Sequence, residues 1–589
     1  MFKRNLFAIG VLLATNFMAA KADVDPNFHI YLCFGQSNME GNAQWEDVDN
    51  EVDSRFQMLA TTNFDNPDPK RKRTMGNWYT ANCPIVSPMG KLGPTDYFGR
   101  TMVAAMPTNV KIGVVAVAMG GSPIEMFDKD KYEQKLKDNP TEWWAQLSKN
   151  YYGSNPYGRL IEMVKKAQES GVIKGILLHQ GCSNCGNPEW PNMVKKIYND
   201  MLADLNLNAE DVPLFVGETE YENMGGGCSS HNTVVAKIPS VIPTGHVVSA
   251  EGIPGNGTDP WHFSAAGYRT LGKRYAFEAL KVMGKDIKAN ADYNMAENLK
   301  KFFTIESFEN SDDMTVRLGS TKRLVITGKF ADGHTEPLTN EAVISSNDFT
   351  IEDGVLKATE AKSGVISVSY TDFLGNKLQK NINVEVSDQG PNHVLVVDNG
   401  TAGANSWDKQ CNTMLNASMT VGKTYIVRAQ IKAENPGECA LWPIWTTSPN
   451  KNQWGGSTDV QYLAAVNLKS EFDEYTWKFT ANYAIDKIQF AFGLIGGKVY
   501  FDDVSCVEEG NTTEMVINGD FESDDLTKWE VIGYNGQKMA IEELGTTSGI
   551  KQITSNKPQS NVRYNLAGQA VDENYKGIII QNGRKRVNK

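Results

Sequence analysis

A serine near the start of the chain and an Asp–His pair far downstream have the residue types and the order of a hydrolytic triad. Ser37 lies in Gly35-Gln36-Ser37-Asn38-Met39-Glu40-Gly41, directly after the apolar run 28–34, and the second segment is Asp259-Pro260-Trp261-His262. A serine hydroxyl is a poor nucleophile at neutral pH; it needs an imidazole to take its proton and a carboxylate to orient that imidazole. Either segment alone occurs by chance. Together they predict Ser37 as nucleophile, His262 as general base and Asp259 as the orienting carboxylate.

Short apolar runs and helical patterns alternate between residues 28 and 284. The predicted strands are Phe28–Phe34, Lys111–Ala118, Gly175–His179, Pro213–Gly217 and Gly245–Ala250, and the predicted helices are Tyr97–Met106, Arg159–Ser170, Asn192–Leu205 and Ser264–Met283. Continuous apolar strands separated by amphipathic helices predict an α/β fold with a parallel sheet covered on both faces. Sites in such sheets lie beyond the carboxyl ends of the strands. Ser37, Gly120-Gly121 and Gln180 each follow a predicted strand, so we expect them to meet.

Four segments together resemble the sequence blocks of an SGNH-type esterase. They are Gly35–Gly41, Ala118-Met119-Gly120-Gly121-Ser122, His179-Gln180-Gly181 and Asp259–His262. Within that group, residues 28–284 resemble carbohydrate esterase family six and the related sialate O-acetylesterases. The resemblance implies a flavodoxin-like, three-layer domain with five parallel strands. It also implies the removal of acetyl groups from sugars without a metal or other cofactor.

The resemblance also implies which groups stabilise the tetrahedral oxyanion. These are the backbone amides of Ser37 and Gly121 and the side-chain amide of Gln180. Gly121 is favoured over Gly120 because it directly precedes Ser122, as in the family's block. Glycine allows the backbone to approach the reacting carbonyl, and a neutral amide donor stabilises the oxyanion without disturbing the charges of the triad.

One segment departs from the family's pattern. Relatives continue Gln-Gly with Glu-Ser-Asp, whereas this chain has Cys182-Ser183-Asn184. Two acidic positions are lost, so the triad is intact but the contacts around it and the substrate preference can differ. Elsewhere we expect Glu218 and Glu220 to be solvated carboxylates, and His231 to lie in a loop or to cap a helix.

The sequence after the esterase-like domain predicts β-rich modules. Trp442, Trp445 and Trp454 cluster in one of them, where exposed rings would stack on sugars and buried rings would serve only the core. A module of this kind would keep the enzyme near an insoluble substrate. The expected organisation is a signal peptide (1–22), the esterase-like domain (23–287), an immunoglobulin-like β-sandwich (300–388), a carbohydrate-binding-module-like β-sandwich (391–510), a partial β-module or linker (511–552) and a C-terminal sorting-type tail (553–589).

The N-terminal segment indicates export. Lys3 and Arg4 precede the apolar run 6–18, and Ala20-Lys21-Ala22 provides small residues for cleavage, as in a secretory signal. We therefore expect a secreted or cell-surface protein, or a periplasmic one, without a membrane span. The formal net charge of −12, with no basic patch, argues against nucleic acid as a partner.

The eight cysteines permit disulfides in an exported protein, and we favour structural bridges among some of the four in the esterase-like domain over metal binding. They are Cys83, Cys182, Cys185 and Cys228.

These observations predict a secreted serine esterase that deacetylates a plant cell-wall polysaccharide, with acetylated xylan as the favoured substrate. A sialate or other sugar O-acetylesterase would use the same triad. A third possibility is a carbohydrate-binding surface protein whose hydrolase domain is inactive, against which the complete set of Ser37, Asp259 and His262 argues.

Overall fold

The computed structural model describes residues 24–544, except 310, 353, 389–391, 454, 510, 512 and 534–535, and four short stretches nearer the C-terminus, 563–565, 570–571, 577–581 and 584–588. The chain divides into two compact units, Met1–Glu543 and Leu544–Lys589. The expected signal peptide, residues 1–22, lies outside the described residues.

The N-terminal domain is built on a seven-stranded sheet with the order β3-β2-β4-β1-β5-β6-β7. Its strands are β1 (Phe28–Gly35), β2 (Phe56–Leu59), β3 (Trp78–Thr80), β4 (Lys111–Ala118), β5 (Val172–His179), β6 (Leu214–Gly217) and β7 (Gly245–Val248). All neighbouring pairs are parallel except β2 with β3. The predicted α/β fold is confirmed. The sheet is larger than the five strands implied by the resemblance, because β2 and β3 extend it beyond β4.

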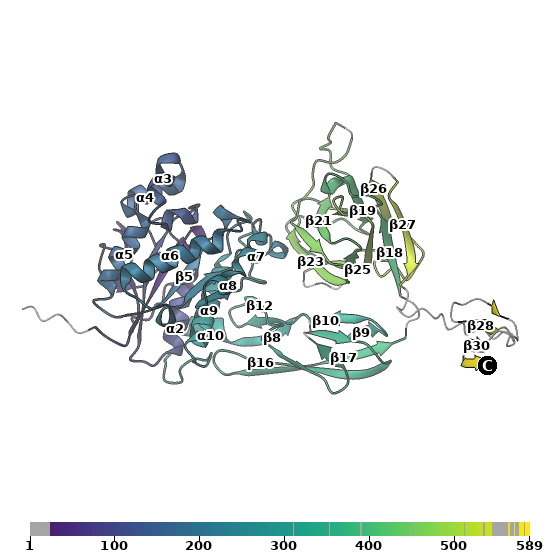
Figure 1. Ribbon diagram of the computed structural model, residues 1–589, viewed down its shortest axis with the longest axis horizontal. Helices are drawn as coiled ribbons and strands as arrows, with labels where there is room; N and C mark the ends of the chain where they lie inside the picture. Colours follow the sequence, from purple (N-terminus) through teal and green to yellow (C-terminus); the bar gives the residue numbers. More distant parts are fainter. Residues whose placement is uncertain are drawn as a thin grey trace, which may run out of the picture. The chain divides into compact units, whose positions relative to one another are not determined.

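Helices cover both faces of this sheet (Figure 1). They are α1 (Ser37–Glu40), α2 (Pro94–Ala105), α3 (Tyr132–Asp138), α4 (Trp143–Tyr152), α5 (Pro156–Ala167), α6 (Trp190–Leu205), α7 (Asn232–Val235), α8 (Ile238–Val241) and α9 (Ala265–Val282). Alternate β1 side chains enter different cores: Tyr31 and Cys33 pack with α2 and α9, and Leu32 packs with α5 and α6. Because a strand buried on both faces has no solvent side, its sequence is continuously apolar.

Helix α10 (Glu297–Phe303) leads into a first β-sandwich with its own apolar core. Its strands are β8 (Ile305–Glu309), β9 (Met314–Arg317), β10 (Thr321–Arg323), β11 (Thr327–Phe330), β12 (Thr335–Pro337), β13 (Val343–Ser345), β14 (Thr350–Glu352), β15 (Val355–Lys357), β16 (Lys362–Thr371) and β17 (Lys377–Ser387). A buried ion pair joins it to the N-terminal domain: Lys273 of α9 donates to Glu336 of β12, and their side chains are 3% and 2% exposed. His334 Nε2 also bonds Glu336, at 2.8 Å.

A second β-sandwich consists of two five-stranded sheets, β23-β20-β25-β18-β27 and β22-β21-β24-β19-β26. Its strands are β18 (His393–Asp398), β19 (Lys409–Met414), β20 (Thr424–Ala433), β21 (Gly437–Ile444), β22 (Ala465–Leu468), β23 (Asp473–Thr480), β24 (Lys487–Ala491), β25 (Lys498–Glu508), β26 (Trp529–Gly533) and β27 (Lys538–Glu543). The last two strands pair with β19 and β18. The sandwich thus continues past residue 510, and part of the segment expected as a partial module or linker supplies its edges.

In the second unit, four short strands form one sheet with the order β29-β28-β30-β31. They are β28 (Arg563–Asn565), β29 (Ala570–Val571), β30 (Gly577–Gln581) and β31 (Arg584–Asn588). The rest of the expected sorting-type tail, 553–589, lies outside the described residues, and its role stays a prediction. Across the described residues, no helix is both long and apolar enough to cross a bilayer.

Candidate active site

Ser37, His262 and Asp259 form one continuous chain of hydrogen bonds. Ser37 begins α1 immediately beyond the end of β1, and its Oγ lies 2.9 Å from His262 Nε2. His262 Nδ1 lies 2.9 Å from both carboxylate oxygens of Asp259. This arrangement can move a proton from the serine hydroxyl to the imidazole while the carboxylate holds the ring in place. The structure brings together the three residues that the sequence predicts as the triad.

The Asp259 carboxylate is held ionised by its surroundings. Partial burial raises its pKa, but hydrogen bonds from His262, from Asn256 Nδ2 at 2.8 Å and from the Trp261 backbone at 2.9 Å outweigh burial, so the pKa is lowered overall. An ionised Asp259 stabilises the positive imidazolium that forms when His262 takes a proton. The chain continues directly into α9, which is N-capped by Ser264 through a 3.0 Å bond from Gly267 N.

Three polar side chains of the Gly35–Gly41 motif tie the nucleophile turn to other segments. Gln36 Oε1 accepts from the backbone amides of Gly181 and Ser183, at 3.1 and 3.3 Å. Asn38 Nδ2 donates to the Trp261 carbonyl at 2.9 Å, which joins α1 to the loop of the catalytic Asp and His. The polar residues at alternating positions of the motif therefore fix the turn that carries Ser37. The motif extends beyond Ser37 itself because these neighbouring side chains hold that turn in place.

Glu40 forms the third tie and is buried. Its Oε1 accepts from Ser87 Oγ at 2.7 Å and its Oε2 accepts from Gly120 N at 2.8 Å. Ser87 Oγ itself accepts from the amides of Met89 and Gly90, so its own hydrogen is directed to Glu40. Burial raises the pKa of Glu40 to about 7, although both hydrogen bonds favour the ionised form. Glu40 thus connects the nucleophile helix to the loop after β4.

Among the described residues, the backbone N–H groups of Ser37, Asn38 and Gly121 at this site have no hydrogen-bond partner, whereas the N–H of Gly120 is bonded to Glu40. Gly121 has a φ of +77°, a conformation that side chains rarely adopt, so glycine is required for this loop geometry. The geometry agrees with the choice of Gly121 over Gly120 as an oxyanion donor, and that role stays a proposal.

Gln180 is fully buried and its amide is already bonded. Its Nε2 donates to Asn184 Oδ1 at 2.7 Å and to the Ser122 carbonyl at 3.3 Å, and its Oε1 accepts from Trp190 Nε1. The Trp190 bond fixes which end of the amide is the donor. Both amide hydrogens therefore have protein acceptors in the resting site. A contribution of Gln180 to the oxyanion requires one of these bonds to be exchanged, and it stays a prediction.

The segment that departs from the family's pattern braces two loops. Asn184 Oδ1 accepts from Ile124 N at 2.9 Å, and its Nδ2 donates to Glu125 at 3.1 Å. Ser183 Oγ donates to the carbonyl of Gly121 at 2.9 Å. Neutral side chains at these positions therefore support the Gly121 loop. Directly after them, a disulfide joins Cys185 to Cys228, while Cys83 and Cys182 are free.

Glu218 and Glu220 are buried, so the expectation that they are solvated is wrong. Glu218 accepts from Tyr221 OH at 2.9 Å and from Ala250 N at 3.1 Å, and burial raises its pKa. Glu220 is 2% exposed, and its pKa rises to about 8, first through burial and then through the charge of Asp259. A carboxylate at the end of β6 gives no sequence signal for burial, because its neighbours come from distant segments.

His231 and His179 lie outside the triad. His231 is buried against the Trp190 ring, and its Nδ1 accepts from Gly186 N at 3.3 Å. His179 Nε2 lies 2.9 Å from the Glu218 carbonyl, which supports the sheet end below Gln180. Burial lowers the pKa of each imidazole to about 4, so both remain neutral near neutral pH.

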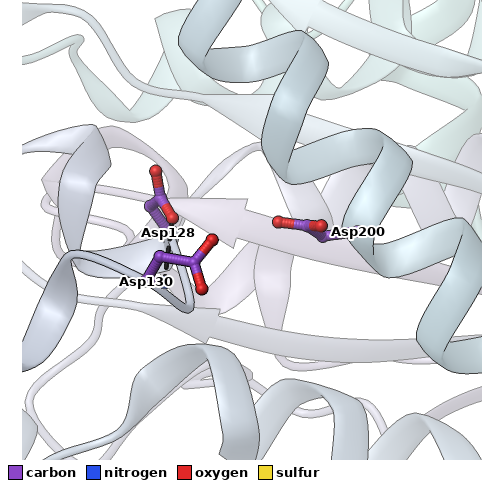
Figure 2. A group of neighbouring side chains, drawn as sticks. All are labelled: Asp128, Asp130 and Asp200. Carbon is purple, nitrogen blue, oxygen red and sulfur yellow. Dashed lines mark hydrogen bonds between the residues drawn. The ribbon is translucent and has the colours of Figure 1, made fainter.

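A cluster of three carboxylates elsewhere in the domain has the residue types of a cation site. Figure 2 shows Asp128, Asp130 and Asp200 with their carboxylates facing a common centre. Lys196 supplies the positive charge there, with its Nζ 2.8, 2.7 and 2.8 Å from Asp128, Asp130 and Asp200, respectively. The three carboxylates thus form an ion-pair network with Lys196, and we assign no metal to it.

The predicted sugar-binding tryptophans lie in and after β21. Trp442 is half-buried and makes an edge contact with the exposed Tyr462 at 5.3 Å. Trp445 is also half-buried, and its indole donates to Thr447 at 2.8 Å. Trp454 lies outside the described residues. A role of these rings in stacking on sugar stays a proposal.

Sequence comparison assigns a family to the domain that carries this site. Residues 27–281 match the family described as "Carbohydrate esterase, sialic acid-specific acetylesterase". The N-terminal domain is a carbohydrate esterase domain. The match includes all three triad residues, and it confirms the resemblance to sialate acetylesterase-like enzymes that the four sequence segments indicate.

Solved structures also resemble parts of the chain. NanS is 16% identical, with 44% of this chain and 99% of that chain covered, at a TM-score of 0.34. XAC1771, a carbohydrate acetylesterase from Xanthomonas citri, is 17% identical, with coverages of 61% and 81% and a TM-score of 0.34. The PbXyn10C carbohydrate-binding module is 20% identical, with coverages of 27% and 92% and a TM-score of 0.23. At these TM-scores, the assignment of the carbohydrate esterase domain depends on the family match alone.

Proposed function

We propose that this protein is a secreted carbohydrate O-acetylesterase that acts through an acetyl-enzyme on Ser37, with acetylated xylan as its substrate. The observation that carries the proposal is the unbroken chain of hydrogen bonds from Ser37 through His262 to Asp259. The family match supports the reaction class, an esterase acting on carbohydrate.

In the first half-reaction, Ser37 Oγ attacks the acetyl carbonyl carbon while His262 Nε2 takes its proton. The negative charge that develops on the carbonyl oxygen is accepted by the N–H groups of Ser37 and Gly121, with Gln180 as the third proposed donor. Each such donor typically contributes ~10²–10³ in kcat. His262 then gives its proton to the sugar oxygen, the carbon–oxygen bond breaks, and acetylated Ser37 remains.

In the second half-reaction, a water molecule replaces the sugar as the reactant. His262 takes a proton from the water, whose oxygen attacks the acetyl carbon of the Ser37 ester. The same donors accept the second oxyanion, and collapse returns the proton to Ser37 Oγ and releases acetate. Throughout, Asp259 keeps its charge and holds the imidazole.

The charges around Ser37 favour a neutral sugar over sialic acid. Sialic acid carries a carboxylate, which binds best against Arg or Lys. Among the described residues, no Lys or Arg side chain bonds to the segments around Ser37, which are 36–41, 119–123, 180–184 and 256–262. Glu40 belongs to the first of these segments, and Glu220 lies close enough to Asp259 for the Asp259 charge to raise the pKa of Glu220. A neutral acetylated xylose unit fits this setting better than an anionic sugar.

The remaining modules fit the same role. Export is proposed from the N-terminal segment, and attachment to insoluble polysaccharide is proposed for the second β-sandwich, with Trp442, Trp445 and Trp454 as its sugar-stacking rings. Tethering would raise the effective concentration of the esterase domain on its substrate without changing its chemistry.

The test is acetate release from acetylated xylan, glucomannan, pectin and O-acetylated sialic acid by the full chain, with Ser37→Ala as control. We expect the highest kcat/KM on acetylated xylan and none with the variant. Preference for O-acetylated sialic acid would identify a sialate esterase. No release from any substrate, with sugar binding retained, would identify a binding protein with an inactive hydrolase domain.

A further inference from the structure

Two exposed tryptophans border the candidate active site without any assigned role. Trp143 and Trp261 are 58% and 48% exposed, which is high for the largest apolar side chain. In the described part of the chain, neither indole N–H donates a hydrogen bond. Each ring therefore presents apolar surface and a free donor to solvent.

Trp143 lies beside the nucleophile. Its Nε1 atom and the Ser37 Cβ atom are 3.6 and 3.8 Å from the point where a side chain on Gly120 would begin. Its neighbour Trp144 is 7% exposed and packs in the core, which anchors the start of α4. The exposed ring is thus carried by a fixed helix end and forms one border of the Ser37 site.

Trp261 lies in the chain between Asp259 and His262, and hydrogen bonds hold its backbone in place. Its backbone N–H donates to Asp259 Oδ1 and its carbonyl accepts from Asn38 Nδ2, both at 2.9 Å. The preceding carbonyl, of Pro260, accepts from Gly227 N at 2.8 Å. Because the backbone is bonded on both sides, the indole is exposed on a rigid support, which lowers the entropy cost of binding through it.

Such rings match the chemistry of a neutral pyranose. A sugar ring has faces of C–H groups, which pack on aromatic faces, and hydroxyls at its edge, which can accept from an indole N–H. Ordered, exposed tryptophans around a reacting centre are typical binding anchors. We propose that Trp143 and Trp261 form the sugar-stacking subsite that positions the neutral pyranose whose acetyl ester reaches Ser37. This inference rests on the proposed function and names its substrate-binding residues.

The first experiment separates sugar binding from ester chemistry. Trp143→Ala and Trp261→Ala are assayed in the full chain for acetate release from acetylated xylo-oligosaccharide and from ethyl acetate, which has no ring to stack. We expect kcat/KM on the oligosaccharide to fall about 5- to 30-fold in each variant, mostly through KM. On ethyl acetate both variants should match the wild type. Trp143→Phe, which keeps an aromatic face, should recover most of the loss.

Trp407→Ala is the matched control, because Trp407 is 55% exposed but belongs to the second β-sandwich. It should leave both activities on soluble substrates unchanged. Unchanged oligosaccharide kinetics in Trp143→Ala and Trp261→Ala would overturn the subsite. Equal losses on both substrates would also overturn it, since the rings would then serve the chemistry or the local fold.

The second experiment does not depend on turnover. Calorimetric titration of acetylated xylo-oligosaccharide into Ser37→Ala gives a Kd, which should weaken about 5- to 30-fold when either tryptophan is also replaced by alanine. If the wild type hydrolyses neither ester but this weakening is observed, the proposed function fails and the subsite stands. If the wild type is active but Kd is the same with and without the tryptophans, the subsite fails and the proposed function stands.

Discussion

The replacement Glu40→Gln tests how the nucleophile helix positions the loop after β4. Both Glu40 oxygens act as acceptors, one from Ser87 Oγ at 2.7 Å and one from Gly120 N at 2.8 Å. Ser87 Oγ cannot accept instead, because the amides of Met89 and Gly90 already donate to it. Glutamine presents one acceptor and one donor. One of the two bonds must therefore be replaced by a contact between two donors.

The expected size of the effect follows from the lost bond. A hydrogen bond to a charged group contributes ~1.5–3 kcal/mol. If this free energy holds the Gly120-Gly121 loop in place for the oxyanion, kcat should fall about 10- to 150-fold, with a smaller change in KM. Ser87→Ala removes the competing hydroxyl hydrogen, so adding it to Glu40→Gln should recover part of the loss.

The assay is steady-state acetate release from ethyl acetate, alongside circular dichroism to show that each variant is folded. The pH profile adds a second readout. Burial raises the pKa of Glu40 to about 7, and protonation adds a donor as glutamine does. Wild-type kcat should therefore fall as pH drops below about 7, and the Glu40→Gln variant should lack this contribution. A folded Glu40→Gln variant with kcat within about twofold of wild type at pH 8 would show that the Glu40 carboxylate does not position the Gly120-Gly121 loop for catalysis.

Two further predictions concern the oxyanion and the junction with the first β-sandwich. Gln180→Ala should lower kcat by ~10²–10³. Asn184→Ala, which removes one acceptor of the Gln180 amide, should lower kcat far less. If Gln180→Ala raised KM and left kcat unchanged, Gln180 would be a substrate contact and not an oxyanion donor. Glu336→Gln leaves Lys273 buried and unpaired, so the free energy of unfolding at pH 7 should fall by about 3–5 kcal/mol when measured by denaturant titration. Replacing both residues, Lys273→Met with Glu336→Met, should recover most of this loss. Burial raises the pKa of Glu336, but the charges and hydrogen bonds of Lys273 and His334 lower it by more, so the net pKa is below that of a free glutamate. The ion pair therefore stabilises the fold above pH ~4.3, and this stabilisation is lost as the pH falls below that value. Glu336→Gln should not show this pH dependence.

The α/β core and the triad were predictable because their signals are local. The strands β1, β4 and β5 each contain an apolar run, and the segments after them supply Ser37, Gly121 and Gln180. The Asp–His pair lies three residues apart, so its mutual contact needs no knowledge of the fold. The sequence therefore predicts which strand ends meet, and the structure supplies the distances.

The features that the sequence does not predict depend on contacts between distant segments. The strands β2 and β3 have four and three residues, too short for an apolar pattern. Glu220 is buried by the loop at Gly255, where any side chain would collide with its carboxylate. Likewise, β26 and β27 pair with strands more than 100 residues earlier, so the true end of the second sandwich has no local signal. Trp143 begins a helix and resembles an ordinary surface residue until its position near Gly120 and Ser37 is known.

A serine-directed fluorophosphonate shows whether Ser37 is the nucleophile. In the reaction, Ser37 Oγ bonds to phosphorus and fluoride leaves, so intact-mass and peptide analysis report where the label is attached. We expect one adduct, on the peptide that contains Ser37, with ester hydrolysis lost in step with labelling. Ser37→Ala should be folded, unlabelled and reduced in kcat by ~10⁴-fold or more. Labelling at another serine, or a folded Ser37→Ala variant with near-wild-type turnover, would show that Ser37 is not the nucleophile.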